Sequence, residues 1–261
     1  MPNVHYKGQG GLLDVEVHPD FLDNNYIYVS YSQPKKGKAF TAVARAKLIR
    51  DQLEDFEIIY STEYKHFSRK TVHFGSRFAI SGDYLFFSIG DRGKQNDAQN
   101  KILPNGKIHR IYLDGSIPID NPFINVKNAI KSIWTYGNRN PQGLAFDSSG
   151  RLWELEHGPK GGDEINIIQK GLNYGWPEIT YGINYSGTTI TKNKSLPNME
   201  QPLYYWIPSI APSCFEYITS NRYEDWQGSL LAGALKFKYL ERIVLEKNKV
   251  VYREKIAEDL G

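Results

Sequence analysis

A strand–turn–strand pattern recurs along this chain at a constant spacing, and it limits the possible folds more than any other feature. Leu12, Phe78 and Leu144 occupy equivalent points of the pattern and lie 66 residues apart each time. A regular repeat of sheet units without helical periodicity is typical of a β-propeller or a related radial array. A β-sandwich also has short strands, but it does not predict a repeated signature at constant spacing.

The first copy of the pattern predicts four short strands joined by polar turns, at residues 12–18, 26–32, 40–48 and 57–60. Such a run is typical of one antiparallel four-stranded sheet. Later copies predict strands within residues 77–92, 108–115, 142–155, 164–168, 213–218, 228–233 and 242–246. We therefore predict an all-β protein over residues 1–261, a single β-propeller domain in which about four four-stranded antiparallel blades are present.

Composition excludes several classes of function. Lys and Arg total 32 and Asp and Glu total 29, so the net charge of +3 does not favour nucleic acid as a partner. No apolar run approaches the roughly 18 residues of a membrane helix, and residues 1–7 lack the apolar segment of a signal peptide. The single cysteine, Cys214, excludes an intrachain disulfide, and we expect it to be a small buried thiol. Nothing in the sequence indicates an oligomeric state.

Polar clusters occur at matching points of the repeat, just before the first strand of each blade. In a propeller, the loops at these points converge on one face around the central channel, so residues far apart in sequence share a site. The clusters are Gln9; His73 with Arg77; Arg139, Asn140 and Gln142; and residues 208–213.

Each candidate also has a purely structural interpretation. His73 could be a general base, because its ordinary pKa is near neutrality, or a structural histidine. Arg139 could bind an anion or a developing alkoxide, or form a salt bridge between blades. Residues 158–164 could offer oxygens to Ca²⁺, or form an acidic turn. Trp206 could stack on a flat ligand, or fill space between blades.

Several motifs, taken together and in order, resemble the soluble quinoprotein glucose/sorbosone dehydrogenases, and among them the PQQ-dependent aldose sugar dehydrogenases. The motifs extend from residue 8 to about residue 240. They are GQGGLL (8–13), HPDF (18–21), HFGSR (73–77), IGDRG (89–93), GNRNPQGL (137–144), EHGPKGGDEIN (156–166), NYGWP (173–177) and WIPSIAPS (206–213).

The resemblance implies a six-bladed propeller and a set of catalytic residues. His73 would be the base that takes the proton from the anomeric hydroxyl of the sugar while hydride passes to the quinone. Asp91 matches a position near that base and would orient it. Arg139 would polarise the quinone oxygen and stabilise negative charge on the reduced cofactor.

The resemblance also implies ligand contacts. Asn140 and Lys236 would contact PQQ together with Arg139, Trp206 would flank the plane of the cofactor, and Gln9 would line the sugar pocket, where we also place Gln142. The carbonyl oxygens of Gly158 and Pro159 would hold the Ca²⁺ that polarises PQQ. Glu164 and the carbonyl of Tyr174 would bind a second, structural Ca²⁺.

We therefore expect a periplasmic or secreted enzyme that oxidises aldoses to lactones, with PQQ and Ca²⁺ as cofactors and an electron acceptor that the sequence does not name. Chains of this family are longer, so we expect about four of six blades, truncated at both ends; the family's PQQ-binding arginines would follow residues 258–261. Two alternatives stay open: a metal-dependent propeller lactonase and a non-catalytic extracellular propeller that binds partners.

Overall fold

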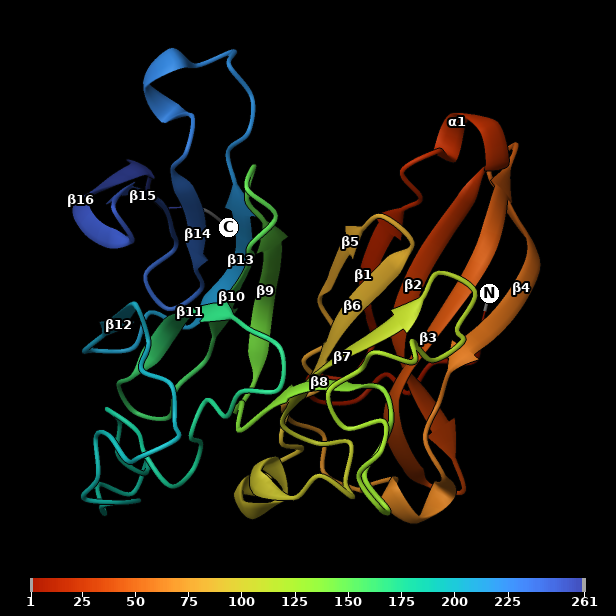
Figure 1. Cartoon of the computed structure of the whole chain (residues 1–261), viewed down its shortest axis with the longest axis horizontal. Coiled ribbons are helices and arrows are strands. Elements are labelled where there is room, and N and C mark those ends of the chain that lie inside the picture. Colours follow the sequence, from red (N-terminus) through yellow and green to blue (C-terminus); the bar gives the residue numbers. More distant parts are fainter. Residues whose placement is uncertain (1, 260–261) are drawn as a thin grey trace.

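The computed structural model describes residues 2–259, so Leu260 and Gly261 at the chain end lie outside the described residues. Strands dominate, and they form four separate four-stranded sheets (Figure 1). Within residues 2–259 the helical elements are α1 (Phe21–Asn24) and three short 3₁₀ turns, η1 (Tyr64–His66), η2 (Gln95–Gln99) and η3 (Glu224–Trp226).

Each sheet is an antiparallel meander whose strands follow one another in chain order. The first sheet contains β1 (Leu12–Val17), β2 (Tyr26–Lys35), β3 (Lys38–Ile49) and β4 (Gln52–Tyr60). The second contains β5 (Phe78–Ser81), β6 (Tyr84–Ile89), β7 (Lys107–Tyr112) and β8 (Ile133–Tyr136). The third contains β9 (Pro141–Phe146), β10 (Leu152–Glu156), β11 (Asp163–Ile168) and β12 (Tyr204–Trp206). The fourth contains β13 (Pro212–Tyr217), β14 (Leu230–Ala234), β15 (Tyr239–Glu246) and β16 (Lys249–Ala257).

The predicted repeat is confirmed at the level of sheets. Leu12 begins β1, Phe78 begins β5 and Leu144 lies within β9, so each marks the first strand of a sheet. These first strands also neighbour one another in space, because β1 contacts β5, β5 contacts β9 and β9 contacts β13. Four separate sheets arranged in this way exclude a two-sheet sandwich and are consistent with a propeller-like fold.

Apolar clusters fill the spaces between successive sheets. One cluster joins the first two sheets through Phe40 and Phe87, and another joins the second and third through Phe86 and Leu152. Phe86 and Phe87 are neighbours on β6 and point to opposite faces, as alternation along a strand requires. Because both faces of the second sheet are buried, β6 is apolar at every position except Ser88 and does not alternate.

The third interface joins the last two sheets and includes Trp206, Phe215 and Leu230. Cys214, next to Phe215 on β13, points to the opposite face and is exposed. The prediction of a buried Cys214 thiol is therefore wrong, because strand alternation places Phe215 rather than Cys214 in the core.

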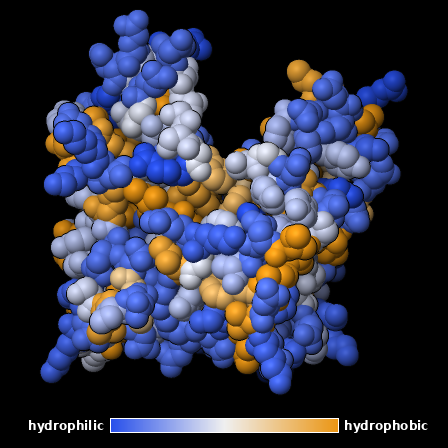
Figure 2. Space-filling model, in the orientation of Figure 1, coloured by the Kyte–Doolittle hydropathy of each residue, from blue (hydrophilic) through white to orange (hydrophobic). Residues whose placement is uncertain are grey.

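The space-filling view shows a notch between the part of the molecule that carries the first sheet and the part that carries the fourth (Figure 2). In the cartoon, these two sheets stand on opposite sides of the molecule, with the second and third between them (Figure 1). Among residues 2–259 we find no helix with the length and apolarity needed to span a bilayer.

Candidate active site

The polar clusters that precede the first strands meet in space, as the sequence predicts. The side chain of Gln9 accepts a hydrogen bond from the backbone N–H of His73 at 2.6 Å. Asn140 accepts one from the N–H of Gly75 at 3.2 Å. A cavity of about 210 Å³ opens at this junction, and its lining includes Gln9, Gly75, Arg77, Asn140, Gln142 and His157. Loops of different sheets thus build one polar pocket.

His73 and Asp91 form a hydrogen-bonded pair beside this pocket. Nδ1 of His73 lies 2.7 Å from Oδ1 of Asp91, and the two side chains are 17% and 2% exposed. Burial by itself raises the pKa of Asp91, but the hydrogen bond and charge of His73, the charge of Arg139 and the indole N–H of Trp176 outweigh burial and lower it. An ionised Asp91 accepts the Nδ1 proton, so Nε2 of His73 keeps its lone pair and can act as a base.

The backbone around His73 is closely fitted. His73 has a φ of 52°, in the left-handed region that a residue with a side chain rarely adopts. Gly90 packs directly against this turn, since a Cβ at Gly90 would lie 2.4 Å from the His73 carbonyl oxygen. A glycine at position 90 is therefore needed, because the segment after β6 passes very close to the backbone of His73.

Arg139 and Asn140 are fixed by one buried carboxylate. Oε2 of Glu156 accepts the backbone N–H of Arg139 at 2.6 Å and that of Asn140 at 3.1 Å. The guanidinium of Arg139 lies over the ring of Trp176, 5.3 Å from its centroid. Within residues 2–259, Nε of Arg139 is buried and has no hydrogen-bond partner. The guanidinium therefore has an unused donor for an acceptor atom of a ligand.

The loop that follows Glu156 presents carbonyl oxygens to the same region. Nη1 of Arg139 donates to the carbonyl of Gly158 at 2.7 Å, and Ser209 Oγ donates to that of Pro159 at 2.9 Å. Asp163 holds the loop by accepting the Gly158 N–H at 2.8 Å. Each carbonyl oxygen has a second lone pair, so both can still bind a hard cation.

A second group of oxygen atoms, from Glu156, Glu164 and Tyr174, lies next to Arg139. Glu156 and Glu164 are cross-strand neighbours on β10 and β11, and both line a small cavity of about 10 Å³ with Tyr174. Burial raises the pKa of Glu156 to about 7. Burial and the nearby carboxylate of Glu156 raise the pKa of Glu164 well above its usual range. Buried carboxylates of this kind favour a proton or a cation as neighbour.

Across residues 2–259, no three His, Cys, Asp or Glu side chains are arranged to hold a metal ion together. Ca²⁺ bound in this region would therefore rely partly on main-chain carbonyl oxygens, such as those of Gly158, Pro159 and Tyr174. This donor set fits a hard cation that prefers oxygen.

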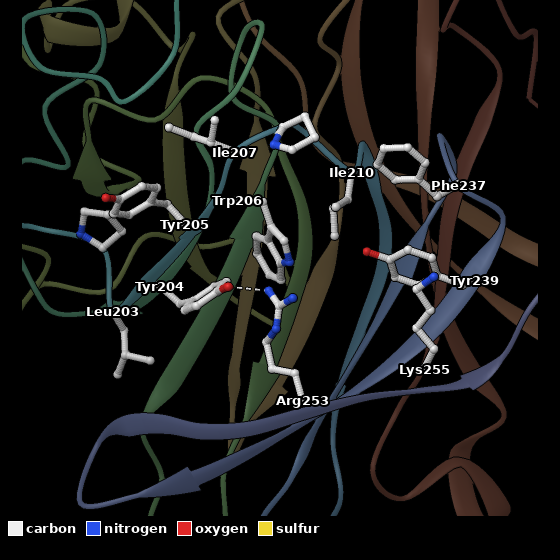
Figure 3. A pocket seen from close by; sticks show the side chains of 12 residues that line it. Leu203, Tyr204, Tyr205, Trp206, Ile207, Ile210, Phe237, Tyr239, Arg253 and Lys255 are labelled. Atoms are coloured by element: carbon white, nitrogen blue, oxygen red, sulfur yellow. Dashed lines mark hydrogen bonds between the residues drawn. The ribbon is translucent and has the colours of Figure 1, made fainter.

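Two predicted cofactor residues, Lys236 and Trp206, belong to the third and fourth sheets and their interface. Lys236 is next to Leu235, which lines the 210 Å³ cavity, and its backbone N–H donates to the carbonyl of Ile210 at 3.1 Å. Trp206 is 4% exposed and belongs to the core between the third and fourth sheets. It borders a different, larger groove of about 890 Å³, where Tyr204, Arg253 and Tyr239 surround it (Figure 3). The role of Trp206 beside a cofactor stays a prediction.

Sequence reasoning missed two residues that support the site. Trp176 donates its indole N–H to Asp91 Oδ2 at 2.9 Å, although the two residues are 85 positions apart. Arg92 is fully buried, lies 3.4 Å from the ring centroid of Phe74 and donates to the carbonyls of Lys70 and Val72. Arg92 lies in the motif IGDRG and Trp176 in the motif NYGWP. These motifs are the one feature of the sequence that points to the two residues, because the groups they contact are distant in sequence.

Known proteins are similar to this sequence over its whole length. Residues 1–261 match the family model described as glucose/sorbosone dehydrogenase. The aldose sugar dehydrogenase of Escherichia coli is 42% identical over 268 residues, which cover 100% of this chain and 72% of that relative. The chain belongs to the glucose/sorbosone dehydrogenase family. The family predicted from the motifs is therefore confirmed.

Other members of the glucose/sorbosone dehydrogenase family are similar over shorter shares of their length. Quinoprotein glucose dehydrogenase B of Acinetobacter calcoaceticus is 36% identical over 225 residues, covering 74% of this chain and 46% of that protein. The chain thus spans less than half of the Acinetobacter relative and about three quarters of the Escherichia coli one.

Solved structures agree with the family assignment. The soluble aldose sugar dehydrogenase from Escherichia coli in its apo form matches with a TM-score of 0.91 at 40% identity, covering 99% of this chain and 75% of that one. The PQQ-bound form of aldose sugar dehydrogenase from Streptomyces coelicolor matches with a TM-score of 0.79 at 26% identity, covering 99% and 70%. The four sheets are therefore arranged as in sugar dehydrogenases of this family.

Proposed function

We propose that this chain carries the catalytic residues of a PQQ- and Ca²⁺-dependent aldose dehydrogenase that oxidises the anomeric hydroxyl of a sugar to the lactone. The observation that carries the proposal is the junction at which Gln9 and Asp91 hold His73 beside Asn140 and Arg139. Relatives named aldose sugar dehydrogenase and quinoprotein glucose dehydrogenase, and a PQQ-bound structural neighbour, support it.

His73 is the proposed base. Oxidation of a hemiacetal requires loss of the hydroxyl proton and of a hydride from the same carbon. Nε2 of His73 takes the proton, and Asp91 stabilises the resulting imidazolium through the 2.7 Å bond to Nδ1. Bound PQQ supplies the hydride acceptor. Gln9 and Gln142 line the polar pocket in which the sugar hydroxyls would be bound.

The residues around Arg139 fit the proposed cofactor. The free Nε donor of Arg139 and its positive charge suit an electron-rich oxygen, and Asn140 lies next to it. Lys236 supplies a further cation, and Trp206 an aromatic surface. The carbonyl oxygens of Gly158 and Pro159 would bind the Ca²⁺ at the cofactor. Glu164 and the Tyr174 carbonyl would bind a structural Ca²⁺ that neutralises the buried carboxylates.

We further infer that the four sheets belong to a closed six-bladed propeller and that the protein acts in the periplasm or outside the cell. The propeller-like order of the sheets and the 72% coverage of the Escherichia coli relative support the first inference. The second rests on the family alone.

The decisive variant is His73→Ala. It is made in this chain and in a hybrid protein in which residues 1–261 replace the matching segment of the Escherichia coli aldose sugar dehydrogenase. We expect sugar-dependent dye reduction to fall by about 10²- to 10⁴-fold, as loss of a general base predicts, while PQQ still binds. The matched control is His66→Ala, since His66 lies on η1 and shares no hydrogen bond with the site.

The result also separates the alternatives. If the protein is a non-catalytic binding propeller, neither the wild type nor His73→Ala will reduce the dye. A lactonase would hydrolyse lactones without PQQ. A variant that binds PQQ and turns over as fast as the wild type would contradict the assignment of His73.

A further inference from the structure

The carboxylate of Asp91 is held at both of its oxygens. Oδ1 accepts Nδ1–H of His73 at 2.7 Å and the N–H of Gly93 at 2.7 Å. Oδ2 accepts the indole N–H of Trp176 at 2.9 Å, and within residues 2–259 this is its one hydrogen bond. The side chain of Asp91 is almost completely buried, so water does not replace a lost partner easily. Trp176 therefore decides whether the carboxylate can turn about its Cβ–Cγ bond.

Trp176 is itself firmly placed. Its backbone N–H donates to the Gly137 carbonyl at 2.8 Å, and its own carbonyl accepts Nε2 of Gln99 at 2.7 Å. The ring is 6% exposed and carries the guanidinium of Arg139 on its face. One side chain thus contacts both the carboxylate behind His73 and the arginine assigned to the cofactor.

We propose that Trp176 is a positioning residue, whose indole N–H fixes the Asp91 carboxylate and thereby the ring orientation and tautomer of His73. This inference rests on the proposed function for its kinetic consequence, but its structural consequence concerns this chain alone. Without the indole N–H, Asp91 has one oxygen unpaired and rotates to recover a partner, which weakens its bond to Nδ1. The neutral imidazole then no longer keeps its proton on Nδ1, and Nε2 loses the free lone pair.

The chain contains a closely matched control. Trp153 donates its indole N–H to Asp147 Oδ2 at 2.9 Å and is fully buried. The guanidinium of Arg151 lies over its ring at 5.4 Å, as that of Arg139 lies over Trp176 at 5.3 Å. The carboxylate of Asp147 accepts the backbone N–H of Arg151 in the turn between β9 and β10. Within residues 2–259 it forms no hydrogen bond with His73. Trp153→Phe and Trp176→Phe thus remove the same kind of bond, one outside the site and one inside it.

The first readout uses the chain without any cofactor. ¹⁵N NMR of histidine-labelled protein at alkaline pH, where imidazoles are neutral, reports which ring nitrogen of His73 carries the proton; loss of a signal in His73→Gln assigns it. We expect the Nδ1–H tautomer in the wild type and in Trp153→Phe, and a mixture of tautomers in Trp176→Phe. An unchanged tautomer in Trp176→Phe overturns the proposal.

The second readout is steady-state kinetics in the hybrid protein. Trp176→Phe should lower kcat about tenfold relative to Trp153→Phe, because a misplaced catalytic group slows the reaction, while KM changes less than about twofold. Equal kcat values in the two variants overturn the role in catalysis. If the wild type shows no turnover at all, the dehydrogenase proposal fails, but the tautomer result still decides the role of Trp176.

If Trp176→Phe does not fold, an indole analogue at the same position tests the proposal. Incorporation of β-(3-benzothienyl)alanine at position 176 replaces the N–H by sulfur and keeps the two-ring shape. The same tautomer shift is expected with this analogue, and its absence overturns the proposal.

Discussion

At the scale of single residues, the site is organised by buried polar side chains rather than by exposed ones. Asp91 and Glu156 are almost fully buried, and each holds groups from segments distant in sequence. Asp91 joins His73 to Trp176, while Glu156 holds the backbone of Arg139 and Asn140. A buried carboxylate that accepts several hydrogen bonds fixes geometry well, because any other arrangement leaves buried polar groups without partners.

A carboxylate outside the site gives a pH dependence of stability. Burial raises the pKa of Glu16 from 4.5 to about 7, and the charges of Asp14 and Glu216 add to this effect. The folded chain therefore keeps a proton on Glu16 that the unfolded chain releases above pH 4.5. Stability conferred by this group is complete below that pH and is lost as the pH rises toward 7.

We expect Glu16→Gln to remove this loss. At pH 8 the variant should melt about 2–4 °C above the wild type, a modest shift because Glu16 is partly solvated, and at pH 4.5 the two should melt together. Thermal unfolding at both pH values measures this, with Glu178→Gln as an exposed control. If the melting difference is the same at both pH values, titration of Glu16 does not govern stability.

The repeat predicts that Gln9, His73 and Arg139 lie close together, because each precedes the first strand of a sheet. Asp91 follows β6, the second strand of its sheet, and its position near His73 was predicted from the family resemblance. Trp176 was not predicted, because its contact with Asp91 depends on the path of the chain between β11 and β12. Periodicity carries no information about such a path.

At the scale of elements, the loop between β4 and β5 carries His73. Arg92, a buried residue that follows β6, holds this loop in place. Its guanidinium donates to the carbonyls of Lys70 and Val72, on either side of Thr71, and lies against Phe74. A planar fork can reach both carbonyls at once, whereas a lysine ammonium cannot keep the same geometry.

Arg92→Lys should therefore loosen the loop without unfolding the sheets. We expect amide hydrogen exchange of residues 70–76 to become about tenfold faster, consistent with the loss of one charged hydrogen bond. Hydrogen-exchange mass spectrometry compares this variant with Arg110→Lys, whose buried guanidinium bonds Asn121 instead. Faster exchange in the loop of both variants, or of neither, would show that Arg92 does not anchor it.

Strand prediction succeeded where both faces of a strand are apolar or alternate clearly, as for β1, β2, β3 and β6. It missed β8, β12 and β16. These are the outermost strands of their sheets; β12 has only three residues, and β16 carries exposed charged side chains with no apolar alternation. An outermost strand pairs on one edge only, so its sequence is weakly constrained.

At the scale of the whole molecule, successive sheets pack through apolar interfaces and leave their first strands side by side. This arrangement places the loops that precede those strands at one junction, where residues from all four sheets line a single pocket. The fold thus explains how Gln9, His73 and Asn140 meet, although the first and the last of them lie more than a hundred residues apart in the sequence.

The measurement that tests the central claim most directly is dye-linked oxidation of an aldose by the hybrid protein, with PQQ and Ca²⁺ added together, singly or not at all. The isolated chain is assayed in parallel. The account predicts turnover that requires the sugar, PQQ and Ca²⁺ together and that disappears in His73→Ala. A hybrid that is folded by circular dichroism but reduces no dye with aldoses under any of these conditions would contradict it.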